Sequence, residues 1–212
     1  PVASGSRAIA ISAGAVALGQ MAKGVGATTV AVGNSSRSLG NNAVAMGNTA
    51  NAGAAGAIAI GQQANYQTTG TVGYKTTGAN SISIGVRSNS ATQNAIVLGT
   101  GAAVTAATAV GGQISDRAGN NYSTNLVGTT TGLNSIAIGA FSQVKGVNAA
   151  AIGQSSEALG QNSFAAGNDS HAIGKSSTAL GDGAKALNNS AQAFGYTATA
   201  SGVNGIAMGN NA

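Results

Sequence analysis

A glycine returns every fourteen residues over most of this chain, and this period restricts the possible folds more than any other feature. The anchor glycines are Gly19, Gly33, Gly47, Gly61, Gly85, Gly99, Gly139, Gly153, Gly167, Gly181, Gly195 and Gly209. A second glycine follows many of them after seven residues, at Gly26, Gly40, Gly146, Gly160, Gly174 and Gly202, with Asn188 in the same column. Each repeat therefore has two halves, and each half closes on a residue suited to a tight turn or a positive φ.

The residues one and three positions before the anchor glycine are mostly apolar and often β-branched, as in Val16 and Leu18 or Ile136 and Ile138. A spacing of two with this preference indicates a β-strand, so both columns share one face. We expect that face to form the core.

The column between these two is almost uniformly alanine, with Ser83 and Val97 as exceptions. Because alanine is a poor strand former, we interpret the column as an outward face kept small so that another sheet can approach it. This predicts a homotrimer whose chains meet at Ala17, Ala31, Ala45, Ala59, Ala137, Ala151, Ala165, Ala179, Ala193 and Ala207.

The second half of the repeat has its own pattern. Three residues after the anchor stands Ala or Ser, as in Ala22 and Ser36, which predicts a narrow inward position. The next column is polar and variable, from Lys23 to Glu157 and His171, and is expected to face water. Short strands of this kind bury little alone, so stacking them as coils of a β-solenoid is the expected solution. A helix would carry a glycine in every second turn, at about 1 kcal/mol each.

Two further columns carry predictions. An Asn five residues before many anchors, as in Asn134, Asn148 and Asn162, should satisfy turn backbone groups and stack between coils as a ladder. Six residues after the anchor lies a broken apolar column with Val25, Leu39, Leu159, Ile173 and Leu187, interrupted by Gln67, Thr105, Lys145 and Ser201. This column could receive an extended partner, but a seam against a neighbouring subunit is favoured.

Two insertions interrupt the period, between Gly61 and Gly85 and between Gly99 and Gly139. We predict a single domain over residues 1–212 with surface insertions near residues 62–80 and 112–131, where binding functions often sit. The candidate ligand contacts in these loops are Tyr66, Tyr74, Lys75, Asp116, Arg117 and Tyr122. A packing or trimer-locking role for the loops is the alternative.

Composition excludes several classes. Nine basic and four acidic residues give a net charge of +5, but no clustered basic patch with interleaved aromatics predicts nucleic-acid binding. The chain has no cysteine, so neither disulfides nor thiolate metal sites are expected. No segment is apolar over the roughly 20 residues that span a bilayer, so membrane insertion by this segment is not expected. Because the chain begins Pro1-Val2, we expect it to be a piece of a longer protein.

Nothing in the sequence points to catalysis. The single histidine, His171, lies in the column expected to face water, and the acids Asp116, Glu157, Asp169 and Asp182 show no dyad spacing. The glycine-rich turns lack the Asp of calcium-binding solenoids, and no phosphate-binding loop motif occurs. Hexapeptide-repeat acyltransferases have a period of six and are excluded. We therefore expect no enzyme activity, no cofactor and no metal.

The motif NSIAIGAFS, with its variants NSISIGVRS, NAAAIGQSS and NSFAAGNDS, closely resembles the repeat of YadA-like heads in trimeric autotransporter adhesins. The resemblance covers nearly the whole chain, including the tails Ala158-Leu159-Gly160 and Ala172-Ile173-Gly174. It implies a left-handed parallel β-roll of 14-residue repeats in each of three chains, at the tip of a fibre on the outer membrane of a Gram-negative bacterium. Such heads bind host extracellular matrix, collagen above all, and promote attachment and autoagglutination. The two insertions and the absence of neck, stalk and anchor leave the ligand open.

Three alternatives stay open. An ice- or crystal-binding solenoid would display a flat threonine ladder, whereas here threonine is scattered. A carbohydrate-processing β-helix would need clustered surface acids. A phage or secreted fibre component would share the fold without binding a host.

Overall fold

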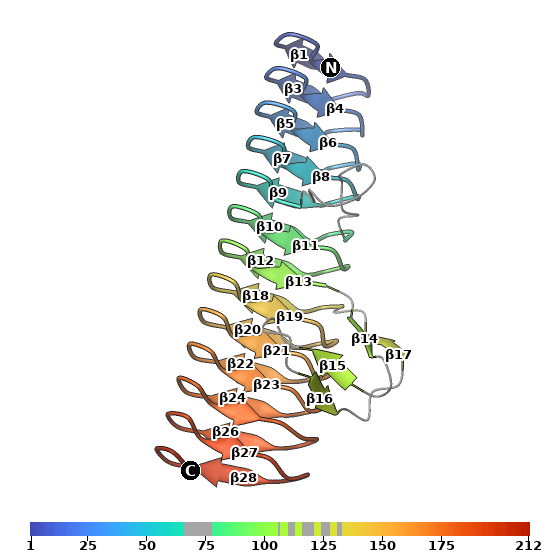
Figure 1. The fold of residues 1–212 in the computed structure, drawn as a ribbon. Coiled ribbons are helices and arrows are strands. Elements are labelled where there is room, and N and C mark those ends of the chain that lie inside the picture. Colours follow the sequence, from blue (N-terminus) through green and yellow to red (C-terminus); the bar gives the residue numbers. More distant parts are fainter. Residues whose placement is uncertain (66–77, 106, 110–112, 116–120, 124–127, 131–132) are drawn as a thin grey trace. The chain divides into compact units, whose positions relative to one another are not determined.

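The computed structural model describes residues 1–65, 78–105, 107–109, 113–115, 121–123, 128–130 and 133–212. Within these residues every regular element is a β-strand, and none of them forms a helix able to cross a membrane (Figure 1). The chain divides into two compact units, unit 1 over Pro1–Gly101 and unit 2 over Ala102–Ala212. Both units are stacks of coils, and each coil contributes one strand to each of two walls.

The first wall of unit 1 is built from three-residue strands in the order β1-β3-β5-β7-β9-β10-β12. Their bounds are β1 Val2–Ser4, β3 Val16–Leu18, β5 Val30–Val32, β7 Val44–Met46, β9 Ile58–Ile60, β10 Ile82–Ile84 and β12 Ile96–Leu98. The second wall consists of two-residue strands, β2 Ile9–Ala10, β4 Lys23–Gly24, β6 Arg37–Ser38 and β8 Asn51–Ala52 in this order, together with β11 Asn89–Ser90.

Unit 2 repeats this arrangement. Its first wall runs β18 Ile136–Ile138, β20 Ala150–Ile152, β22 Phe164–Ala166, β24 Thr178–Leu180, β26 Gln192–Phe194 and β28 Ile206–Met208. Its second wall runs β13 Ala103–Val104, β19 Gln143–Val144, β21 Glu157–Ala158, β23 His171–Ala172, β25 Lys185–Ala186 and β27 Thr199–Ala200.

Neighbouring coils pair in parallel with like residues beside like. Val16 pairs with Val30, Ala17 with Ala31 and Leu18 with Val32, and the same register continues from coil to coil. The parallel all-β solenoid predicted from the period is therefore confirmed. Each column of the sequence becomes a row of equivalent side chains about 4.8 Å apart.

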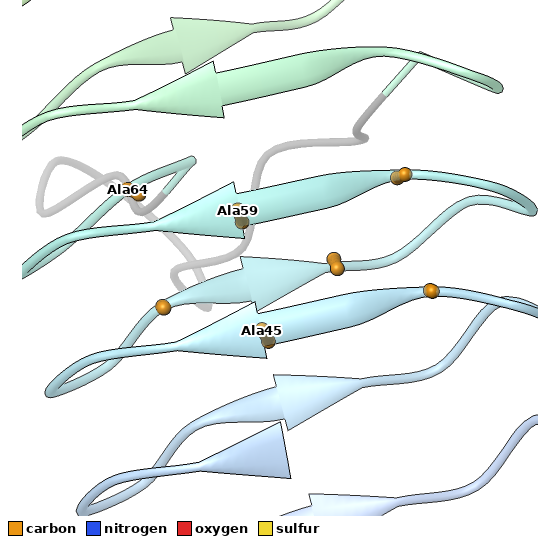
Figure 2. Packing of buried hydrophobic residues seen from close by; sticks show 7 residues of the cluster. Ala45, Ala59 and Ala64 are labelled. Atoms are coloured by element: carbon orange, nitrogen blue, oxygen red, sulfur yellow. The ribbon is translucent and has the colours of Figure 1, made fainter. Parts of the chain in front are cut away.

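The interior is filled by alanine and serine, which corrects the predicted core. Figure 2 shows one cluster of buried alanines, in which Ala45 and Ala59 belong to the first wall. Ala64 lies near them, at the inward position three residues after the anchor Gly61. The complete cluster is Ala43, Ala45, Ala50, Ala52, Ala57, Ala59 and Ala64. The large aliphatic side chains predicted to form the core point outward instead, and Leu18 is 38% exposed. The space between the two walls is narrow, since most inward positions hold Ala or Ser and the largest inward side chains are Val97, Val104 and Val144.

Serine is tolerated in this interior because the turns supply hydrogen-bond acceptors. Ser156 Oγ donates to the carbonyl of Gly153 at 3.0 Å, and Ser163 Oγ donates to the carbonyl of Gly160 at 2.7 Å. The same two contacts recur in other coils, for example from Ser170. A buried hydroxyl with such a partner avoids the cost of desolvation, so Ala and Ser can exchange in these columns. The predicted inward position three residues after the anchor is confirmed.

The two glycine columns have different physical origins. The anchor Gly153 has φ of 133°, a conformation open to glycine almost alone. The second glycine, Gly160, has an ordinary φ, but a Cβ there would lie 1.9 Å from the carbonyl oxygen of Gly174 in the next coil. The anchor column thus requires glycine because of its positive φ and because the next coil lies so close. The second column favours glycine only because the next coil lies so close.

Asparagine completes the turns. Asn148 has φ of 53°, in the left-handed region that asparagine tolerates better than most residues. Its amide nitrogen donates to Asn162 Oδ1 at 3.4 Å, and Asn134 donates to Asn148 Oδ1 at 3.3 Å. The asparagine ladder predicted from the sequence is confirmed in these coils.

The coil stack continues across each insertion. Ile58 of β9 pairs directly with Ile82 of β10, so the first insertion leaves the parallel register intact. The second lies between β13 and β19, where Ala103 pairs with Gln143. It contains two antiparallel strand pairs, β14 Ala107–Ala109 with β17 Gly128–Thr130, and β15 Gln113–Ser115 with β16 Asn121–Ser123. The single-domain boundary 1–212 stays a prediction.

Candidate functional site

The alanine column assigned to the trimer interface points into the coil, so this prediction of side-chain direction is wrong. Within the lone chain no surface is exposed at Ala17, Ala31, Ala45, Ala59, Ala137, Ala151, Ala165, Ala179 or Ala193. Ala207 is partly exposed because no coil stacks beyond it. These side chains have no surface to offer to a second chain, whatever the assembly.

The first wall instead presents mostly large apolar side chains on its outer side, with Ala150, Ala166, Thr178 and Gln192 interspersed among them in unit 2. We call this the aliphatic face: the outward side chains of the three-residue strands in each unit. In unit 1 it includes Met46 and Ile84, which are 41% and 39% exposed, and in unit 2 it includes Ile152 at 41%. Soluble monomers rarely expose so long an apolar surface, so such a surface marks a contact with another molecule.

The outward column of the second wall holds the titratable groups. In unit 2 it brings Gln143, Glu157, His171 and Lys185 into consecutive register on β19, β21, β23 and β25. His171 was expected to be a solvated surface residue, but it is only 7% exposed, and Glu157 is 2% exposed. The expectation that this column faces water is therefore wrong in these coils, and it holds for Lys23 in unit 1.

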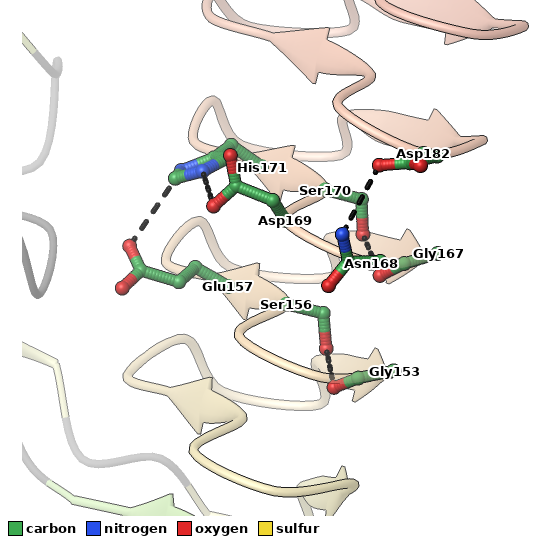
Figure 3. Close-up of polar contacts among 9 residues, drawn as sticks. All are labelled: Gly153, Ser156, Glu157, Gly167, Asn168, Asp169, Ser170, His171 and Asp182. Carbon is green, nitrogen blue, oxygen red and sulfur yellow. Dashed lines mark hydrogen bonds and ion pairs between the residues drawn. The ribbon is translucent and has the colours of Figure 1, made fainter.

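His171 lies between two carboxylates (Figure 3). Its Nε2 is 3.2 Å from Asp169 Oδ1, and its Nδ1 is 3.7 Å from Glu157 Oε2, which is too long for a hydrogen bond. Asp169 is well exposed and Glu157 is buried, so His171 lies between a solvent-facing and a buried carboxylate. This arrangement holds the imidazole in place between adjacent coils.

The cluster lacks the other parts of a reactive site. The nearest hydroxyl along the chain, Ser170 Oγ, points inward and donates to the carbonyl of Gly167 at 3.1 Å. Across the described ranges no three His, Cys, Asp or Glu side chains are grouped to hold a metal ion. The geometry therefore suits a structural link between coils rather than nucleophilic or metal-assisted chemistry.

The apolar column six residues after the anchor differs between the units. Leu159 and Ile173 are fully buried within the lone chain, and Leu187 packs against them. Val25 and Leu39 in unit 1 are half-buried. The predicted subunit seam is thus not available at Leu159 and Ile173, because their surface is already covered.

The predicted ligand-contact residues of the insertions cannot be placed. Tyr66, Tyr74, Lys75, Asp116 and Arg117 lie outside the described residues. Tyr122 belongs to strand β16, where its backbone pairs with Ile114, but its side chain also lies outside the description.

The aliphatic face is the feature that sequence reasoning missed, although a signal was present. Its columns vary widely in size and include Val16, Phe164 and Gln192, whereas the alanine column hardly varies. A position enclosed by two walls has one fixed volume, while an outward position does not. Uniform size, rather than hydrophobicity, marks the interior of this fold.

Comparison with known families supports the repeat assignment. The family model described as YadA head domain repeat (2 copies) matches residues 22–50, 38–64, 77–102, 131–156, 145–170, 172–191 and 189–212. A comparison with curated proteins finds no match. The matched segments cover most of the chain and coincide with the coils of both units, so this chain belongs to the YadA head family.

Proposed function

We propose that this chain is part of the head of a trimeric autotransporter adhesin that attaches a bacterium to host extracellular matrix. The YadA head family, whose members are parts of surface-exposed autotransporter adhesins, supports a location at the cell surface. A left-handed coil, projection from a Gram-negative outer membrane, collagen-type ligands and autoagglutination all belong to this proposal. A structural adhesin needs neither cofactor nor catalytic residue.

The observation that carries the proposal is the aliphatic face. In a lone chain it leaves side chains such as Leu18 and Ile152 about two-fifths exposed in coil after coil. Burying this face against sister chains removes that apolar surface from water, at about 25 cal/mol per Å². In a closed three-fold assembly every chain covers its aliphatic face, whereas an open assembly leaves this face uncovered at its ends.

The proposed assembly explains why apolar residues recur on this face from coil to coil. Its residues project from a regular parallel sheet, so equivalent side chains repeat at one spacing along the whole wall. Repetition also makes the outer surface of the assembly multivalent, and weak contacts then add to a useful avidity. We therefore expect adhesion to be spread over several coils, so that changing one coil weakens binding only modestly.

Two measurements test the proposal. Light scattering should give a mass three times the 20.0 kDa of one chain, and the assembly should bind immobilised collagen, fibronectin or laminin. A stable lone protomer of 20.0 kDa would contradict the assembly, and failure to bind any matrix protein would contradict the ligand class. The ice-binding alternative predicts thermal hysteresis, which we expect to be absent.

A further inference from the structure

Acidic residues are confined to one part of the chain. All four, Asp116, Glu157, Asp169 and Asp182, lie in unit 2, and unit 1 contains no carboxylate side chain. Unit 1 holds the basic residues Arg7, Lys23, Arg37, Lys75 and Arg87. Unit 2 balances its acids with Arg117, Lys145, Lys175 and Lys185, so unit 1 carries the whole formal charge of +5.

Three of these cations lie on consecutive coils, two of them on strands of the second wall and Arg7 in the turn that precedes β2. Lys23 on β4 pairs with Arg37 on β6, the neighbouring strand of the second wall (Figure 1). Paired residues of adjacent parallel strands point to the same face, so the two side chains lie one coil apart on one face. Arg7 lies in the preceding coil, at the turn position that Met21 occupies in the coil of Lys23. We call Arg7, Lys23 and Arg37 the cationic stripe.

A shallow hollow lies within the stripe. Met21, Lys23, Ser35 and Arg37 line it, and its volume is about 190 Å³. That volume is below the roughly 300–1,000 Å³ of sites that enclose a small molecule. It suits a single anionic group of a larger ligand that continues along the wall.

The stripe is accessible and bordered by hydrogen-bonding groups. Arg7 and Lys23 are exposed and Arg37 is partly buried. In the adjoining turn, Asn34 Nδ2 donates to Gln20 Oε1 at 2.9 Å, which forms an amide ladder on the same coils. The stripe lies on the wall opposite the aliphatic face, so the proposed trimer leaves it open and presents three copies.

A fourth cation follows further along the same edge. Arg87 is exposed, and its Nε donates to Gln63 Oε1 at 3.0 Å, which holds the side chain against the wall. Its remaining guanidinium N–H groups can donate two parallel hydrogen bonds to a ligand with paired oxygen acceptors, such as a sulfate or phosphate group. The edge thus offers positive charge over several coils, without a carboxylate anywhere in unit 1 to neutralise it.

We propose that this edge of unit 1 binds a sulfated glycosaminoglycan. Cations on three successive coils, Arg7 in a turn and Lys23 and Arg37 on paired strands, match a linear polyanion better than a single small anion. Single-stranded nucleic acid is less well matched, because its binding uses aromatic side chains for stacking and none of the residues that line the hollow is aromatic. A sulfated polysaccharide also fits a cell-surface protein, since it is the extracellular polyanion of host matrix.

The test compares two charge-matched triple variants of the 212-residue chain. Arg7→Gln/Lys23→Gln/Arg37→Gln removes the stripe, while Lys145→Gln/Lys175→Gln/Lys185→Gln removes as much charge from unit 2. Binding is measured to heparin, desulfated heparin, unsulfated hyaluronan and duplex DNA over a range of salt concentrations. Circular dichroism and the urea midpoint confirm that both variants stay folded.

We expect the stripe variant to bind heparin about tenfold more weakly, because each exposed ion pair contributes roughly 1.5- to 5-fold. Its salt dependence should become shallower, as fewer counterions are released. The unit 2 variant should bind heparin like the parent chain, and desulfated heparin and hyaluronan should bind weakly to all three. Equal losses in both variants, or no loss in the stripe variant, would overturn the proposal.

Tighter binding of duplex DNA than of heparin would also overturn it, in favour of a nucleic-acid surface. Collagen binding is measured on the same three proteins and should not change, because the inference does not depend on the collagen site. Loss of heparin binding with collagen binding retained supports the stripe alone. Heparin binding without any matrix-protein binding supports the stripe and contradicts the proposed ligand class.

Discussion

Replacing the anchor glycine of one coil by alanine should destabilise the whole stack, and Gly153→Ala in unit 2 is the sharpest case. Gly153 has φ of 133°, and a Cβ added there would lie 2.3 Å from the carbonyl oxygen of Gly167. That oxygen is backbone in the next coil and accepts a hydrogen bond from Ser170 Oγ. The amide of Gly167 donates to the carbonyl of Ile152, so the oxygen cannot move aside without disturbing these bonds.

The expected loss of unfolding free energy has two parts. Holding a non-glycine residue in this backbone region costs about 1–3 kcal/mol. Relieving the overlap with Gly167 by shifting backbone costs about 1–3 kcal/mol more, as for an overpacked core. The sum of about 2–6 kcal/mol is a large fraction of the 5–15 kcal/mol that stabilises a typical domain.

The matched control is Gly202→Ala. Gly202 belongs to the second glycine column, has no positive φ, and a Cβ there would meet no atom within 4 Å. Alanine at such a position changes stability by only about 0.5 kcal/mol, or stabilises slightly by restricting the unfolded chain. Urea denaturation followed by circular dichroism compares both variants with the parent. A Gly153→Ala midpoint equal to that of Gly202→Ala would refute the close-approach argument.

Three further predictions follow from the inward and outward columns. Ile84→Glu/Ile152→Glu should convert the proposed trimer to monomers in light scattering while circular dichroism stays unchanged, since both side chains are outward; a persistent trimer would exclude the aliphatic face as the interface. Ala165→Val should cost about 1–3 kcal/mol in urea denaturation by overpacking the interior, more than a conservative change on the outer face of the same strand. His171→Ala should lower the free energy of unfolding in urea by about 1–3 kcal/mol, because it removes the hydrogen bond between a buried imidazole and Asp169 at 3.2 Å; an unchanged free energy would show that this contact contributes nothing.

Much of the fold could be predicted because the repeat expresses local requirements directly. The anchor glycine, the left-handed asparagine such as Asn148 and the alternation along the strand each depend on the backbone of one coil. Stacking then follows, because a short strand can satisfy its backbone groups only with the coil beside it. Period, strand positions and parallel stacking are accordingly the parts that sequence reasoning identified correctly.

Inside and outside were reversed on the first wall because hydrophobicity was taken as the measure of burial. Ile138 is more hydrophobic than Ala137, yet Ala137 is fully buried and Ile138 is only partly buried. In a flattened coil the opposite wall limits the space, and the enclosed volume decides which residue fits. The larger side chain therefore points outward, where the proposed assembly would bury it. The rule that hydrophobic residues lie inside a chain does not consider burial between chains.

The same limit explains the distribution of chemistry along the chain. Because the interior holds mainly Ala and Ser, with a few valines such as Val97 and Val144, charged groups can vary only in outward columns. The first wall uses its outward columns for aliphatic residues, which leaves the second wall as the surface where charge can change. There Lys23 and Arg37 occupy the column that Glu157 and His171 occupy in unit 2. One repeat can therefore present a cationic surface in unit 1 and a balanced, covered one in unit 2 while its interior positions remain small.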